Sequence, residues 1–152
     1  MAQMPIRKKA PTTPVTIWNF VSDVLVVCPR CKNTALVRPE ANQANARLTC
    51  SGCGHSEIRT VDHYILGGAI DPYFHLPLVL QTSVSRHTLW AYNSSHLAFL
   101  RQFIEATDRR RPVRKPTDPL NKLLASRLPR WIFSAKNRDR LLAAIQRIGK
   151  KA

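Results

Sequence analysis

The sequence predicts an α+β protein with short strands in the first part of the chain and helices in the last part. Runs rich in β-branched and aromatic residues, separated by polar loops, occupy much of residues 24–92. From Asn93 onward, apolar residues recur at the three- and four-residue spacing of amphipathic helices. All four cysteines fall in two identically spaced pairs, "CPRC" at 28–31 and "CSGC" at 50–53. This pattern needs a chemical cause.

The two Cys-x-x-Cys pairs predict a metal site. The basic start of the chain runs into Pro11 and Pro14 rather than an apolar signal-peptide core, so we expect a cytoplasmic location. In a reducing compartment, paired cysteines are more often metal ligands or redox thiols than disulfides, and a redox site needs only one pair. Zn²⁺ binds four thiolates in a closed tetrahedral shell, which accounts for both pairs. One structural zinc ion is therefore predicted on Cys28, Cys31, Cys50 and Cys53.

The residues around the cysteines predict a zinc ribbon. Pro29 fixes the backbone of the first Cys-x-x-Cys turn, or knuckle, and Gly52 and Gly54 can take positive φ in the second. His55, beside the second knuckle, is an alternative ligand. The expected strands are "DVLVV" (23–27), "TALVRP" (34–39), "ARLTC" (46–50) and "HSEIRT" (55–60).

The stretch from "DVLVVCPRC" through "LTCSGCGHSEIR" resembles a transcription factor IIB-type zinc ribbon. Three further stretches, "DPYFHLPLVLQT", "HTLWAYNSSHLAFL" and "LASRLPRWIFSAKNRDRLLAAI", resemble a family of small bacterial proteins that contain such a ribbon. The resemblance extends from about residue 23 to about residue 148. It implies the fold and the zinc ligands, and it carries no settled activity.

A β-hairpin and about three helices are predicted after the ribbon. "LPLVLQ" (76–81) and "HTLWAY" (87–92) are the hairpin strands, and their pairing could extend the ribbon's sheet. The regions are a basic tail (1–14), the ribbon (15–66), the hairpin region (67–92) and a basic helical region (93–152), or one domain from 15 to 149.

Each predicted helix has a start signal and an apolar stripe. Ser94 or Ser95 caps the first helix, which extends to the arginines at 109–111, with the stripe Leu97, Leu100, Phe103 and Ile104. Asp118 and Pro119 start the second, with the stripe Leu120, Leu123, Leu124 and Leu128. Ser134 caps the third, which Gly149 ends, with the stripe Leu141, Leu142, Ile145 and Ile148.

The positive charge lies mainly in the last third of the chain. The net charge is +15, and residues 101–152 contribute +11, from 15 basic and four acidic residues. Such an excess favours binding to the phosphates of nucleic acid. An acidic protein partner is the alternative, with the chain as a subunit, adaptor or toxin-neutralising protein. The candidate surface comprises Arg109, Arg110, Arg111, Arg114, Lys115, Arg127, Arg130, Lys136, Arg138, Arg140 and Arg147.

Neither an enzyme nor a membrane protein is predicted. The nine acidic residues are scattered, and Asp71 and Asp118 occupy positions typical of turns and caps. The histidines show no spacing that assembles a catalytic site. Trp90 and Trp131 are expected to be core residues rather than stacking platforms for bases. No apolar run approaches the about 18 residues of a membrane span.

Overall fold

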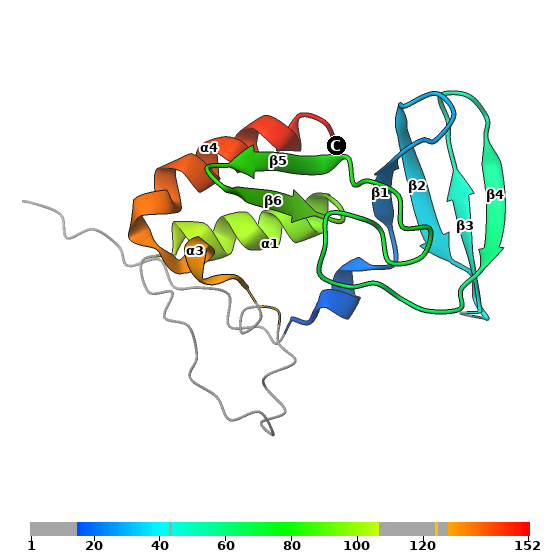
Figure 1. The fold of residues 1–152 in the computed structure, drawn as a ribbon, viewed down its shortest axis with the longest axis horizontal. Helices are drawn as coiled ribbons and strands as arrows, with labels where there is room; N and C mark the ends of the chain where they lie inside the picture. The colour runs from blue at the N-terminus through cyan, green and yellow to red at the C-terminus, as the bar shows by residue number, and fades with distance from the viewer. Residues whose placement is uncertain (1–14, 43, 107–123, 125–127) are drawn as a thin grey trace, which may run out of the picture.

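The computed structural model describes residues 15–42, 44–106, 124 and 128–152 (Figure 1). These residues form an α+β fold with antiparallel strands followed by helices, as the sequence predicts. The elements are η1 (Ile17–Phe20), β1 (Val24–Val27), β2 (Thr34–Pro39), β3 (Asn45–Thr49), β4 (Ser56–Thr60), β5 (Leu80–Val84), β6 (His87–Ala91), α1 (Ser94–Glu105), α3 (Arg130–Phe133), η3 (Ala135–Asn137) and α4 (Arg138–Gly149).

Strands β1 to β4 form an antiparallel sheet in sequence order. The predicted run 34–39 coincides with β2, and the runs predicted for β3 and β4 each begin within one residue of the observed strand. Cross-strand register places Val37 opposite both Val24 and Leu48, so apolar residues share one face. The buried residues of this face are Val24, Val26, Ala35, Val37, Ala46 and Leu48.

A turn built on Asp71 lies beside this sheet. The Asp71 carboxylate is fully buried and accepts the backbone N–H groups of Tyr73, Phe74 and Leu76 at 2.6–2.9 Å. The Tyr73 hydroxyl donates to the Val21 carbonyl oxygen at 2.8 Å, which ties the turn to the chain before β1. The predicted turn role of Asp71 is thus confirmed.

The β5–β6 hairpin is present, but its first strand was placed too early. Residues 82–84 belong to β5 rather than to the loop predicted at 82–86, and the turn is only Ser85 and Arg86. Residues 77–79 lie along β1 instead, where the Val27 N–H donates to the Pro77 carbonyl oxygen at 2.9 Å. The hairpin forms a separate two-stranded sheet, linked to the ribbon through a bridge between Val26 and Leu78.

Helix α1 has the predicted apolar face and a different cap. Asn93, rather than Ser94 or Ser95, is the N-cap, because its side-chain oxygen accepts the His96 N–H at 2.9 Å. Its side-chain amide also donates to the carbonyl oxygens of Phe20 and Asp23, at 2.9 and 2.6 Å. The predicted stripe Leu97, Leu100, Phe103 and Ile104 is buried. The helix ends at Glu105, earlier than predicted, because the next residue, Ala106, has extended backbone (φ −64°, ψ 136°); the arginines at 109–111 lie outside the described residues.

The C-terminal helix begins later than predicted. Two short elements, α3 and η3, precede α4, so Ser134 does not cap this helix, which starts at Arg138. Leu142 is only partly buried, because Ala144 shares the inner face with the predicted residues instead. The buried residues of α4 are Leu141, Ala144, Ile145 and Ile148. The helix predicted from Asp118 lies outside the described residues except for Leu124 and Leu128, which are both buried.

Helices α1 and α4 pack against each other and against the hairpin, with α4 along β5 and α1 along β6 (Figure 1). The buried apolar residues of the sheet, hairpin and helices form one cluster, so the described parts share a core. Within the described residues, no helix is long and apolar enough to cross a membrane.

Candidate metal centre and basic surface

The four cysteines converge at one end of the four-stranded sheet. Cys28 and Cys31 follow β1, and Cys50 and Cys53 follow β3. All four Sγ atoms lie within 4.8 Å of one another, and the Cys28–Cys53 and Cys31–Cys50 pairs are 3.8 and 3.5 Å apart. None of the four is in a disulfide, whose sulfur atoms would be about 2.05 Å apart. These cysteines could hold a metal ion, as the sequence predicts.

The two knuckles have the same backbone hydrogen bonds. The Cys28 carbonyl accepts the N–H of Lys32 at 3.0 Å, and the Cys50 carbonyl accepts that of Gly54 at 2.9 Å. Both donors sit four residues after the cysteine and have positive φ, 65° for Lys32 and 75° for Gly54. The sequence predicts the positive φ of Gly54 and not that of Lys32, although Lys32 follows Cys28 at the same spacing as Gly54 follows Cys50. A non-glycine residue at this φ is uncommon.

Gly52 has a different role from the one predicted. It does not have positive φ. A Cβ atom at this position would lie 2.9 Å from Asn33 Nδ2 and 3.3 Å from Asn33 Cβ. The second knuckle thus approaches Asn33 of the first too closely for a side chain at residue 52, which is why glycine fits there.

The pKa values of Cys28 and Cys31 are shifted in opposite directions. Hydrogen bonds to Cys28, chiefly from the backbone N–H of Cys31, lower its pKa to about 6. The pKa of Cys31 is raised to about 11: the Asn33 N–H acts to lower it, and burial and the neighbouring thiols outweigh that effect. The thiolate form of Cys28 is thus favoured, and the protonated form of Cys31 is favoured. A cation among the sulfur atoms would allow all four to ionise.

Three of the ribbon's four arginines are matched by nearby carboxylates, and Arg30 is the exception among the described residues. Arg47 pairs with Glu40 at 2.9 Å and Arg59 with Glu57 at 2.7 Å. Arg38 likewise pairs with Asp23. The Arg59 guanidinium also lies over the Phe74 ring, 4.9 Å from its centroid. These three cations are therefore largely neutralised within the ribbon.

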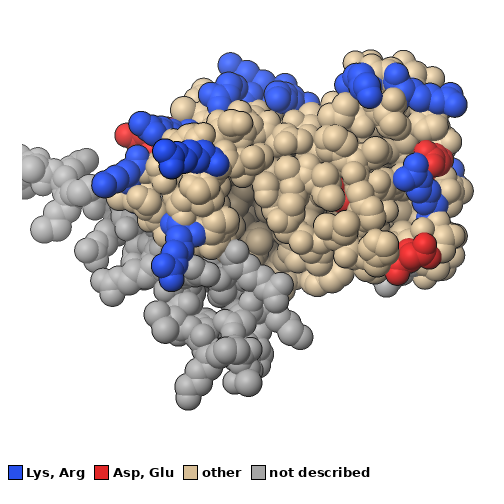
Figure 2. Space-filling view, in the orientation of Figure 1, with Lys and Arg blue, Asp and Glu red and all other residues tan. Residues whose placement is uncertain are grey.

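Helix α4 and the hairpin turn carry cations of a different kind. Arg140 donates to Ser85 Oγ at 2.9 Å, and Arg147 donates to Thr82 Oγ1 at 3.1 Å. Hydroxyl partners hold these guanidiniums in place without neutralising them. We define the α4 basic face as the exposed residues Arg86, Arg140, Arg147, Lys150 and Lys151. Among the described residues, no carboxylate forms an ion pair with any of them. Figure 2 shows blue side chains gathered over this part of the molecule.

The other residues of the predicted basic surface are distributed differently. Arg130 and Lys136 are exposed in α3 and η3. Arg138 is partly buried and donates to the Ala106 carbonyl oxygen at 3.1 Å, at the C-terminal end of α1. The Arg138 guanidinium is thus bound to a backbone carbonyl within the fold. The remaining predicted residues lie outside the described part of the chain: Arg109, Arg110, Arg111, Arg114, Lys115 and Arg127.

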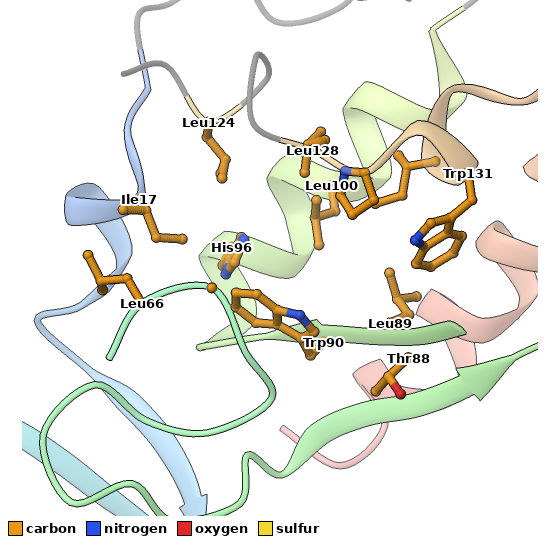
Figure 3. Close-up of a pocket in the computed structure, with 13 residues that line it drawn as sticks. Ile17, Leu66, Thr88, Leu89, Trp90, His96, Leu100, Leu124, Leu128 and Trp131 are labelled. Atoms are coloured by element: carbon orange, nitrogen blue, oxygen red, sulfur yellow. The ribbon is translucent and has the colours of Figure 1, made fainter. Parts of the chain in front are cut away.

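An apolar cavity of about 190 Å³ lies between α1, β6, Leu124 and residues 128–132 (Figure 3). Trp90 and Trp131 line it and are both packed against the core, in line with the role predicted for them. His96 also lines it, and burial lowers its pKa to about 4. The cavity lies apart from both the cysteines and the α4 basic face.

Apart from the four cysteines, the described residues contain no cluster of three or more histidine, cysteine or acidic side chains that could hold a metal ion. No protein-family model, curated protein or solved structure matches the chain.

Proposed function

We propose that the chain is a non-enzymatic zinc-ribbon protein of the cytoplasm that binds nucleic acid through the α4 basic face. The observation that carries this proposal is the contrast between two sets of arginines. Three arginines of the ribbon are paired with carboxylates, whereas Arg140 and Arg147 of α4 are held by hydroxyl groups and keep their charge available. The resemblance to transcription factor IIB-type ribbons of small bacterial proteins is part of the proposal.

Zinc is the metal that the cysteine geometry favours. Four thiolates about 2.3 Å from a tetrahedral Zn²⁺ are about 3.8 Å from one another. The Sγ–Sγ distances of 3.8 and 3.5 Å fit this shell. With Cys28, Cys31, Cys50 and Cys53 as ligands, no position stays open for water or substrate, so the ion would have a structural role.

The α4 basic face suits contacts with a phosphate backbone. Arg140 and Arg147 are seven residues apart, which places them on the same side of α4, and Lys151 follows two residues after the helix ends. At about 1.5 Å per residue, the two arginines are about 10 Å apart along the helix axis. Guanidiniums that already have one hydroxyl partner lose less side-chain freedom when they bind a phosphate.

A salt titration of binding tests the proposal. Fluorescence anisotropy would measure the affinity of the full chain for a labelled duplex of mixed sequence between about 50 and 200 mM salt. The affinity should fall steeply with salt because bound cations release counterions from the phosphates. The double variant Arg140→Gln and Arg147→Gln should reduce the slope of log K against log salt by about two.

The matched control is Arg38→Gln with Arg47→Gln, which removes the same charge from paired sites and should leave the slope unchanged. If the native chain shows no complex at micromolar concentrations near 150 mM salt, the proposal is wrong, since non-specific binders reach about 10⁻⁴ to 10⁻⁶ M there. A salt-sensitive complex with an acidic protein in its place would favour the alternative partner class.

A further inference from the structure

We infer that the metal-bearing turn after β1 is a second phosphate contact and that the ligand is a double-stranded nucleic acid lying across this turn and the α4 basic face. This inference rests on the proposed function and names its substrate class. Arg30 and Lys32 lie in that turn, between Cys28 and β2. Both are exposed, and no carboxylate among the described residues forms an ion pair with them.

The first step is the placement of these two cations. The Lys32 Nζ atom has a weak contact with the Pro29 carbonyl oxygen, at 3.5 Å, which leaves its charge available. The Lys32 N–H donates to the carbonyl of Cys28 at 3.0 Å, so the backbone that carries this cation is held beside the cysteine site. Arg30 lies between Cys28 and Cys31 in the sequence. A metal ion that orders the knuckle would therefore order both cations.

The second step is the relation of this turn to α4. The Val27 N–H donates to the Pro77 carbonyl oxygen, and Thr82, the partner of Arg147, is five residues beyond Pro77. A fully extended chain of that length spans at most about 18 Å. Figure 2 shows the blue groups over α4 and over the turn at the end of β1 along the same upper edge, with uncharged surface between them.

The third step concerns the form of the nucleic acid. The two basic regions lie on one small protein, so the distance between them is far shorter than the persistence length of duplex DNA, about 500 Å. A duplex is stiff over this length and can bridge two separate basic regions across an uncharged gap. Proteins that hold single strands place exposed aromatic rings along the path of the bases. The exposed tryptophan and tyrosine of the described residues, Trp18 and Tyr64, lie instead on η1 and the loop after β4, away from α4 (Figure 1).

The experiment uses the full chain with its metal bound and compares a duplex of about 20 base pairs with one of its single strands. The test variant is Arg30→Gln with Lys32→Gly, because glycine accepts the positive φ of residue 32. We expect the native chain to bind the duplex more tightly than the strand. In the test variant, the slope of log K against log salt for the duplex should be smaller by about two.

The control Arg38→Gln with Arg47→Gln removes the same charge and should retain the native slope. Metal content and melting temperature are measured for every variant. The single change Arg30→Gln, which leaves residue 32 intact, should reduce the slope of log K against log salt by about one.

The outcomes separate the two proposals. If Arg140→Gln with Arg147→Gln weakens binding while the test variant matches the control, the second contact is refuted and the proposed function stands. Equal affinity for single strand and duplex would refute the duplex assignment. If the native chain binds neither, both proposals are wrong.

Discussion

Replacing Leu141 by alanine should destabilise the protein far more than the same change at the adjacent Leu142. The sequence places both leucines on the inner face of the last helix, whereas the structure buries Leu141 completely and Leu142 only in part. The pair therefore tests the observed orientation of α4 with identical chemistry at neighbouring positions.

The expected magnitude follows from the burial. Leu→Ala removes three carbon atoms, and about 0.8 kcal/mol per buried CH₂ gives about 2.4 kcal/mol for transfer alone. The cavity left between α4, β5 and α1 adds to this, so we expect Leu141→Ala to lower the free energy of unfolding by about 3–4 kcal/mol. Leu142→Ala should cost about 1 kcal/mol, since part of its side chain is already in contact with water.

Urea unfolding in the presence of zinc, followed by circular dichroism, measures both variants. For a chain of this size the loss at Leu141 corresponds to a melting temperature lower by between about 6 and 16 °C. Equal losses at the two positions, or a larger loss at Leu142, would show that α4 is rotated from its observed orientation. Metal content is the internal control, because neither leucine lies near the knuckles.

Three further predictions concern the metal centre and the core. Elemental analysis should find one zinc ion per native chain and less in Cys53→Ser. This variant should also have a sharply lower melting temperature, because metal binding is coupled to folding. Normal metal content in Cys53→Ser would contradict the four-cysteine site. Gly52→Ala should lower the free energy of unfolding by about 1–3 kcal/mol, because the new Cβ atom would contact the Asn33 side chain. The loss should be smaller when Asn33→Ala is already present. Equal losses in the two backgrounds would contradict this explanation. His96, with a folded-state pKa of about 4 against 6.5 in its ordinary state, stabilises the protein fully above pH 6.5 and loses that stabilisation as the pH falls towards 4. His96→Gln should lack this component, so its stability should fall less than that of the native chain over this window, and parallel pH curves for the two proteins would refute the assignment.

Local patterns in the sequence were sufficient to predict that the four cysteines lie together and to predict most elements of the fold. Two Cys-x-x-Cys pairs separated by short β-prone runs specify a compact four-cysteine site, because each pair and each strand depends mainly on neighbouring residues. The apolar stripe of α1 follows from the same local reasoning, since residues three and four apart share a helix face. In α4 this reasoning is confirmed for Leu141 and only in part for Leu142, which is half-buried against the core, because the burial of two adjacent residues depends on the packing partner.

Other features depend on contacts between residues far apart in the chain, and only the tertiary structure decided them. Asn93 caps α1 while its amide binds the carbonyl oxygens of Phe20 and Asp23, about 70 residues earlier, which no local signal distinguishes from a serine cap. The sequence predicts Thr82 in a loop, whereas the structure places it in β5, where its hydroxyl accepts a hydrogen bond from Arg147 of α4. The division of the arginines into neutralised and available sets likewise depends on which acceptors the fold brings beside them. Sequence specifies how much charge a chain carries, but ion pairing acts over a few ångströms, so only the folded arrangement determines where that charge remains free to bind.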